Sequence, residues 1–230
     1  WAKNYSDFPN AETFSHNNGN IQTEKYEESI YVGYRYFDSF QKDVEYPFGF
    51  GLSYTDFAVT ADGLCADKDS VSLNVTVKNT GDVYAGKEVA QVYVSCPQRC
   101  MAKEYRRLCG FAKTKLLQPG ESQTMTITVP SKMMASFDEK QAAWVVEKGQ
   151  YGIWVGNSSR NLELVGVLLA EETAVIEKVQ SICPLQEELN EIVRPEEAAL
   201  AWEVEWQKDA QEKGLQPIVF APQEVKTEKI

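Results

Sequence analysis

Apolar and polar residues alternate through the middle of the chain, and this pattern predicts β-strands. In the clearest run, Val71, Leu73, Val75 and Val77 share one face and polar residues take the other. Comparable patterns predict further strands at 57–60, 88–95, 122–129, 143–146, 149–156 and 162–168. About seven short strands separated by turns are typical of an antiparallel β-sandwich of the immunoglobulin or fibronectin type III kind. We therefore expect a mainly β fold, with the sandwich at 56–170.

The residues before the sandwich have a different pattern. Residues 1–30 are polar and rich in loop-forming Asn, Ser and Gly. Ile30, Val32 and Tyr34 then alternate with the residues between them, which fits a strand or a short helix-to-strand join. We assign 1–55 to a separate N-terminal segment.

The residues after the sandwich predict a helical C-terminal tail. Helices are expected at 184–193 and 196–208, and an extended segment is expected at 216–224. Two apolar pairs lie four residues apart, Leu200 with Val204 and Trp202 with Trp206. Pro195 suits the start of a helix and Gly214 suits its end. We assign 171–230 to a helical linker or extension.

Aromatic residues are densest just before the predicted sandwich. The stretches 31–38 and 46–54 together hold eight aromatic residues and three glycines. The rings of Tyr31, Tyr34, Tyr36 and Phe37 fit a sugar-stacking platform, but such clusters more often join two structural units. We therefore expect a seam between two parts of the protein.

Charge and hydropathy exclude several classes of partner. The 230-residue chain has a formal net charge of −11, which argues against binding to nucleic acid or to an anionic membrane. It has no apolar run near the roughly 18 residues that span a bilayer. It begins at Trp1, without a Met and without the basic and apolar regions of a signal peptide. We expect a processed chain, or a piece of a longer one.

The five cysteines favour free thiols in a reducing, cytoplasmic location. They are Cys65, Cys96, Cys100, Cys109 and Cys183. Their odd number and irregular spacing do not match a disulfide framework, although one disulfide is an alternative. A zinc site at Cys96, Cys100 and Cys109 is another alternative, with Cys65 or Cys183 as the fourth ligand. We predict no metal and no cofactor.

The residues that could carry chemistry form no recognisable catalytic set. His16 is the only histidine, and no Ser or Cys motif supports a triad built on it. The segment 48–52 lacks the lysine and the following helix of a phosphate-binding loop. Glycoside hydrolysis needs two carboxylates, but among 34 acidic residues a pair such as Glu27 and Glu28 carries no information. We predict no catalytic residue, and the substrate-binding residues stay unknown.

Ordered motifs over about residues 20–160 resemble the family 3 glycoside hydrolases. Residues 28–38, Glu-Ser-Ile-Tyr-Val-Gly-Tyr-Arg-Tyr-Phe-Asp, are similar to the family's Glu-Gly-Ile-x-Val-Gly-Tyr-Arg-Tyr-aromatic-Asp, with Ser29 in place of Gly. Residues 46–55 are similar to its Phe-Pro-Phe-Gly-(His/Phe)-Gly-Leu-Ser-Tyr-Thr. Further matches to its fibronectin type III-like domain lie at 77–82, 86–94, 110–115, 117–122, 137–138 and 144.

The resemblance implies a non-catalytic part of a retaining β-glucosidase-like enzyme that hydrolyses terminal β-D-glucosyl residues. The family's Asp nucleophile lies on a (β/α)8 barrel, and its Glu acid/base usually lies on an α/β sandwich domain. Both are outside the matched part, and residues 1–55 resemble only the last stretch of the α/β domain. The implied partners are the rest of that enzyme, a β-glucoside or oligosaccharide substrate, and a second copy in a homodimer.

Two matters stay open at the level of sequence. Some family members place the sandwich ahead of the barrel, so the tail at 171–230 fits a linker to a barrel or a C-terminal extension. The alternative function is a stand-alone carbohydrate-binding or interaction module. The dense aromatic stretch argues against a pure interaction module, because an independent domain would expose that apolar surface to water.

Overall fold

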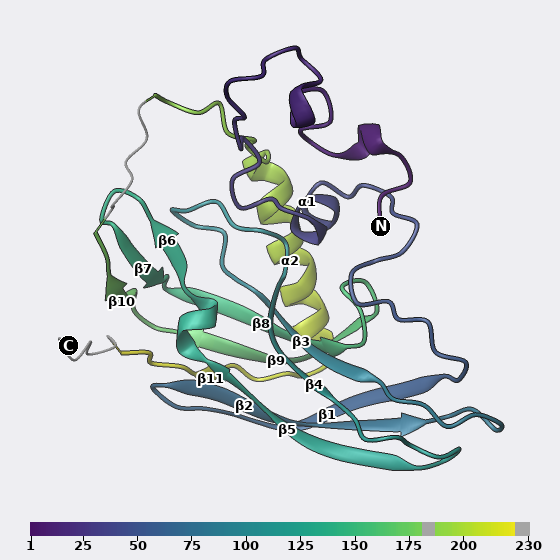
Figure 1. The fold of residues 1–230 in the computed structure, drawn as a ribbon. Coiled ribbons are helices and arrows are strands. Elements are labelled where there is room, and N and C mark those ends of the chain that lie inside the picture. The colour runs from purple at the N-terminus through teal and green to yellow at the C-terminus, as the bar shows by residue number, and fades with distance from the viewer. Residues whose placement is uncertain (181–186, 224–230) are drawn as a thin grey trace, which may run out of the picture.

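A three-stranded antiparallel sheet forms one layer of a β-sandwich. The computed structural model describes residues 1–180 and 187–223 (Figure 1). This layer consists of β1 (Phe57–Ala66), β2 (Ser70–Asn79) and β5 (Ser122–Pro130), in the order β1-β2-β5. The alternation predicted for the central strand is confirmed, because Val71, Leu73, Val75 and Val77 are all buried. They form the inner face of this layer.

A five-stranded sheet forms the second layer, in the order β11-β9-β8-β3-β4. Its strands are β3 (Val89–Ser95), β4 (Arg107–Lys113), β8 (Gly149–Gly156), β9 (Leu162–Ala170) and β11 (Ile218–Val219). Neighbouring strands are antiparallel, except that β11 runs parallel to β9. The mainly β sandwich expected from the sequence is therefore confirmed.

The five-stranded sheet is buried on both of its faces. Its inner face meets the three-stranded sheet in the main core, where Val92, Ile153 and Val155 join the valines of β2. Strands β3 and β8 are buried over almost their whole length rather than at alternate residues. A half-exposed antiparallel sheet would bury only alternate residues, so this sheet requires a cover on its outer face as well.

Helix α2 (Glu196–Glu212) supplies much of that outer cover. Its side chains Trp206 and Ala210 pack with Tyr93, Trp154 and Leu164 of the sheet in a second apolar cluster. Figure 1 shows α2 lying across the five-stranded sheet, on the side away from β1, β2 and β5. The predicted Trp pair is thus the buried stripe of the helix, whereas Leu200 and Val204 face outward.

A second three-stranded sheet extends the main core at one end. It contains β6 (Ser136–Asp138), β7 (Ala143–Val146) and β10 (Ala174–Lys178), in the order β10-β7-β6. The 3-10 helix η3 (Ser131–Met134) connects β5 to it. Met134, Val146 and Ile176 are buried in the same cluster as the sandwich residues, so this sheet shares the core of the sandwich.

The N-terminal segment contains short helices and no strand that pairs with the sandwich sheets. The elements are the 3-10 helices η1 (Tyr5–Asp7) and η2 (Phe14–His16) and the helix α1 (Tyr34–Ser39). The alternation of Ile30 and Val32 therefore does not form a strand, and the helical part of the alternative prediction is correct. Tyr31, Tyr36 and Phe37 are buried together in a third cluster, separate from the two on the sandwich.

The helix predicted at 184–193 is wrong wherever the structure describes that segment. Residues 187–195 have no helical structure, while 184–186 and Cys183 lie outside the described residues. Glu187 and Glu191 would be like charges at i and i+4, which destabilises a short helix. The N–H of Ile192 instead donates to the carbonyl oxygen of Glu27 at 2.8 Å. This non-helical segment is therefore hydrogen-bonded to the N-terminal part of the chain.

Three of the described strands had no strand signal in the sequence: β4, β6 and β10. Strand β11 lies within the segment 216–224, which was expected to be extended. Strand β4 contains Gly110, which argues against a strand when the sequence is considered alone. In the fold this glycine allows β4 and β5 to approach closely, since an added Cβ would lie 3.0 Å from Ile127 and 3.1 Å from Val129. Tertiary packing, rather than local propensity, therefore determines this strand.

The described cysteines are free thiols. Cys96 and Cys109 are buried, whereas Cys65 and Cys100 are exposed. Across 1–180 and 187–223, no three His, Cys, Asp or Glu side chains are grouped closely enough to hold a metal ion. The helices in this part of the chain are too short or too polar to cross a membrane.

Removal of the Trp206 side chain should destabilise the whole sandwich. Trp206→Ala leaves a cavity under α2 and should lower the free energy of unfolding by about 3–5 kcal/mol. The matched control is Val204→Ala on the same helix, where the side chain is 65% exposed. This control should change the free energy of unfolding by less than about 0.5 kcal/mol. Urea unfolding followed by far-UV circular dichroism measures both, and equal effects would contradict the assigned buried face.

The thiols should divide into two reactivity classes. Burial raises the pKa of the Cys96 and Cys109 thiols, so the reactive thiolate is scarce at both positions. In native Cys183→Ser protein, Ellman's reagent should label Cys65 and Cys100 rapidly and reach the other two only after unfolding. Rapid labelling of all four in the native protein would show that the core is open.

Candidate functional site: an aromatic seam

Tyr34 is the centre of the contact between the N-terminal segment and the sandwich. Its ring stacks on Phe48 at 4.8 Å between centroids and meets Tyr93 of β3 edge-on at 5.9 Å. Its hydroxyl oxygen accepts a hydrogen bond from the N–H of Leu108 on β4, at 2.8 Å. Burial raises the pKa of Tyr34, which keeps the phenol neutral. We call this contact, between residues 30–50 and the five-stranded sheet, the aromatic seam.

The other aromatic residues of the segment pack against one another. Tyr31 meets Phe40 edge-on at 5.1 Å, and Tyr36 meets Phe37 edge-on at 5.4 Å. Tyr31, Tyr36 and Phe37 are each at most 9% exposed. A sugar ring needs an open aromatic face, so these buried side chains cannot form the sugar-stacking platform that the sequence allowed as an alternative. Their arrangement is that of a packed junction.

Polar contacts tie the two sides of the seam together. Arg160, in the turn between β8 and β9, pairs with Asp38 of α1 at 2.7 Å. The N–H of Tyr105 donates to the Ser39 hydroxyl at 2.9 Å. On the Gly49 side, the Gln91 amide donates to the glycine carbonyl at 3.3 Å. Gly49 has φ of 81°, and an added Cβ would collide with the Gln91 side chain, so only glycine fits there.

A buried charge network continues the seam beneath α1. Glu104 pairs with Arg107 at 2.8 Å and with Arg35 of α1 at 3.8 Å. Burial alone would raise the pKa of Glu104, but the two guanidinium groups outweigh it and hold that pKa below its usual value. Nearby, Lys103 forms a second buried pair with Glu147. The carboxylates here are neutralised by partners, which is a structural role rather than that of a general acid.

An apolar face remains open where the seam ends. Tyr46, Phe48 and Phe50 are each about half exposed, and beyond them Leu52 is 85% and Tyr54 is 91% exposed. Phe111 of β4 is also exposed, and it pairs across the sheet with Gln91, which contacts Gly49. We call these six residues the exposed aromatic face. Isolated domains rarely leave so many neighbouring apolar side chains in water, so this face is suited to contact another surface.

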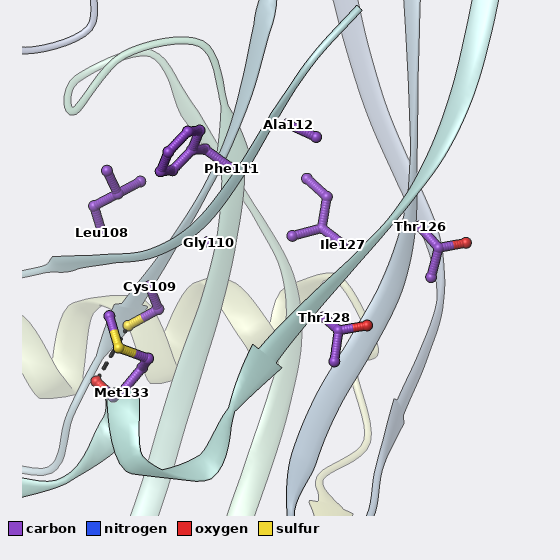
Figure 2. A pocket seen from close by; sticks show the side chains of 9 residues that line it. All are labelled: Leu108, Cys109, Gly110, Phe111, Ala112, Thr126, Ile127, Thr128 and Met133. Carbon is purple, nitrogen blue, oxygen red and sulfur yellow. Dashed lines mark hydrogen bonds between the residues drawn. The ribbon is translucent and has the colours of Figure 1, made fainter.

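A separate hollow of about 470 Å³ lies between the edge strands β4 and β5. Figure 2 shows Phe111, Ile127 and Met133 around it, with the Cys109 thiol donating to the Met133 carbonyl at 3.4 Å. Its lining is apolar apart from two threonines and this thiol, and it contains no carboxylate. The hollow therefore lacks the paired acids that glycoside hydrolysis requires.

The candidate catalytic residues of the sequence lie apart from any such pair. His16 is exposed in η2, and its Nδ1 lies 2.6 Å from the Asn20 carbonyl oxygen rather than beside a carboxylate. Glu27 and Glu28 are half-buried near the segment that carries Ile192. The fold also brings to the seam four residues that were not predicted from the sequence: Tyr105, Arg106, Ser159 and Arg160. No motif marks them, because only tertiary structure joins their segments to α1.

Comparison with known proteins relates this chain to a part of larger enzymes. Residues 88–159 match the fibronectin type III-like domain family. A β-glucosidase from Ruminococcus albus is 42% identical over 191 residues, which are 80% of this chain and 20% of that protein. An exo-α-(1→6)-L-arabinopyranosidase from Bifidobacterium breve is 43% identical over 148 residues, 64% of this chain and 19% of that protein. The chain spans about a fifth of the length of these relatives.

Solved structures give the same relationship. A β-glucosidase from Paenibacillus barengoltzii aligns with a TM-score of 0.73 and 41% identity, over 78% of this chain and 20% of that one. A GH3 β-glucosidase from Bifidobacterium adolescentis aligns with a TM-score of 0.62 and 36% identity, over 73% of this chain and 24% of that one. The chain therefore belongs to glycoside hydrolase family 3 and carries its fibronectin type III-like domain.

Proposed function

We propose that this chain is the non-catalytic, structural part of a retaining family 3 β-glycosidase, and that it braces the catalytic domains. The exposed aromatic face is the observation that carries the proposal. It continues directly from the buried part of the aromatic seam, so its open side chains are placed to extend the same kind of contact to a further domain. The rigid sandwich would hold that face in a fixed orientation.

The proposed partner is the rest of the same enzyme, with its (β/α)8 barrel and most of the α/β sandwich domain. The relatives support this, because the matched part is about a fifth of their length. The proposed substrate is a β-glucoside or oligosaccharide with a terminal β-D-glucosyl residue, in line with the names of most relatives. One relative is named for an L-arabinopyranoside, so that sugar belongs in the test.

Two further parts of the proposal concern the setting of the enzyme. We place it in a reducing, cytoplasmic compartment, which is supported by the free thiols among the described cysteines. We also expect a homodimer of the assembled enzyme.

The alternative of a stand-alone carbohydrate-binding or interaction module fits the seam less well. Of the four predicted platform residues, three are buried and Tyr34 is stacked on Phe48. An independent module would also have to leave the exposed aromatic face in water.

The seam should weaken measurably when Tyr34 loses its hydroxyl. Tyr34→Phe leaves the Leu108 N–H without its acceptor and should lower the free energy of unfolding by about 1 kcal/mol. Hydrogen exchange at Leu108 should become faster. Tyr46→Phe is the control, since the Tyr46 hydroxyl has no hydrogen bond to a described residue. Equal effects of the two changes would show that the hydrogen bond between Tyr34 and Leu108 does not stabilise the seam.

Catalysis should require the remainder of the enzyme. The purified chain should not hydrolyse an aryl β-glucoside or an aryl α-L-arabinopyranoside. Co-expression with a chain that carries the barrel and the rest of the α/β domain should produce activity toward one of them. Turnover by the isolated chain would refute the non-catalytic assignment.

A further inference from the structure

A polar hollow of about 280 Å³ opens beside the aromatic seam. Three segments meet there: the end of α1, the loop before β4, and the turn between β8 and β9. The lining residues are Asp38, Gln41, Tyr105, Arg106, Ser159 and Arg160. All six carry hydrogen-bonding groups, in contrast to the apolar hollow of Figure 2.

Arg106 is held rigidly at this hollow without a carboxylate partner. Its guanidinium carbon lies 3.8 Å from the ring centroid of Trp154 and 4.4 Å from that of Tyr105. One Nη donates to the Tyr105 hydroxyl at 2.9 Å. No acidic side chain of the described residues lies within ion-pair distance of it. Burial lowers the pKa of Arg106, but the group stays charged, and its planar donors are preorganised for a ligand.

Asp38 and Arg160 add a hydrogen-bond acceptor and a further donor to the lining of the hollow. Arg160 Nε pairs with Asp38 Oδ1, and Arg160 Nη2 donates to the Lys42 carbonyl at 2.6 Å. Asp38 Oδ2 and Arg160 Nη1 make no hydrogen bond with a described residue. The ion pair therefore fixes both side chains and leaves each with unused hydrogen-bonding capacity.

One feature of the lining costs stability and has no structural use within the described chain. Ser159 is 4% exposed, and its hydroxyl has no partner among the described residues. Gln41, in contrast, has φ of 50° because it ends α1, where the Lys42 N–H donates to the Phe37 carbonyl at 2.8 Å; glycine is preferred at such a position. A buried polar group without a partner requires an explanation, and a ligand at the hollow would supply the partner.

The hollow presents both hydrogen-bond donors and an acceptor to a ligand. Arg106 and Arg160 Nη1 can donate, and Asp38 Oδ2 can accept. Adjacent hydroxyl groups can donate and accept at the same time, so a polyol matches this mixture of donors and acceptors. We propose that the hollow binds a single neutral pyranose ring through its hydroxyl groups.

Amide chemical shifts of the full chain, titrated with methyl β-D-glucopyranoside, test this site without any catalytic readout. Saturable shifts should appear at Gln41, Arg106 and Ser159, with affinity in about the millimolar range. Arg106→Lys keeps the charge but loses the planar fork, and should weaken binding about tenfold or more. Gln41→Gly relieves the strain, so it should retain or raise the melting temperature while also weakening binding.

The matched control is Ser29→Gly, which relieves the same kind of strain, at φ of 51°, away from the hollow. It should leave the sugar affinity unchanged. The proposal is overturned if no saturable shift appears up to about 100 mM sugar, a range that would capture any specific site of millimolar affinity. It is also overturned if Arg106→Lys and Gln41→Gly bind the sugar as tightly as the unchanged chain. Reproduction of the shifts by sodium acetate or phosphate would overturn it as well, because it would indicate an anion site. Since no turnover is measured, each outcome leaves the bracing role to be decided separately.

Discussion

The burial of both faces of the five-stranded sheet is the constraint on which the rest of this structure depends. Strands β3 and β8 carry apolar side chains inward and outward, so the sheet is not stable with one side in water. The three-stranded sheet covers the inner face. The outer face is divided between α2, through Trp206, and the N-terminal segment, through Tyr34. The two flanking segments are therefore structural parts of the sandwich unit and not independent appendages.

This division explains why the aromatic stretch is so dense. Its rings are needed to fill the outer face and to pack the segment's own small cluster. The ion pair of Asp38 with Arg160 and the network of Glu104, Arg107 and Arg35 then fix the orientation of α1. The carboxylates found at the seam are thus already committed to cations. The aromatic side chains of Tyr46, Phe50 and Tyr54 stay exposed, and we propose that they contact a surface outside this chain.

The sequence predicted what depends on periodicity and missed what depends on tertiary packing. The alternation from Val71 to Val77 identifies a strand with one buried face, and the spacing of Trp202 and Trp206 predicts a helix. That this helix docks on the sheet was not predicted, because Leu200 and Val204 have the same spacing and are exposed. Strand β4 was not predicted because the reason for Gly110, the close approach of β4 to β5, exists only in the folded protein. The segment at 187–193 was misassigned because its backbone pairs with residue 27. The polar hollow was not foreseen, since Arg106, Ser159 and Asp38 belong to segments that are remote in sequence.

The central claim is that the exposed aromatic face is covered by the rest of the enzyme. Hydroxyl-radical footprinting measures this directly, by comparing the chain alone with the chain assembled with its barrel-bearing partner. Modification of Tyr46, Phe50 and Tyr54 should fall strongly on assembly, while buried Tyr31 should be protected in both states. Unchanged modification of all three exposed side chains in an active assembly would contradict the account.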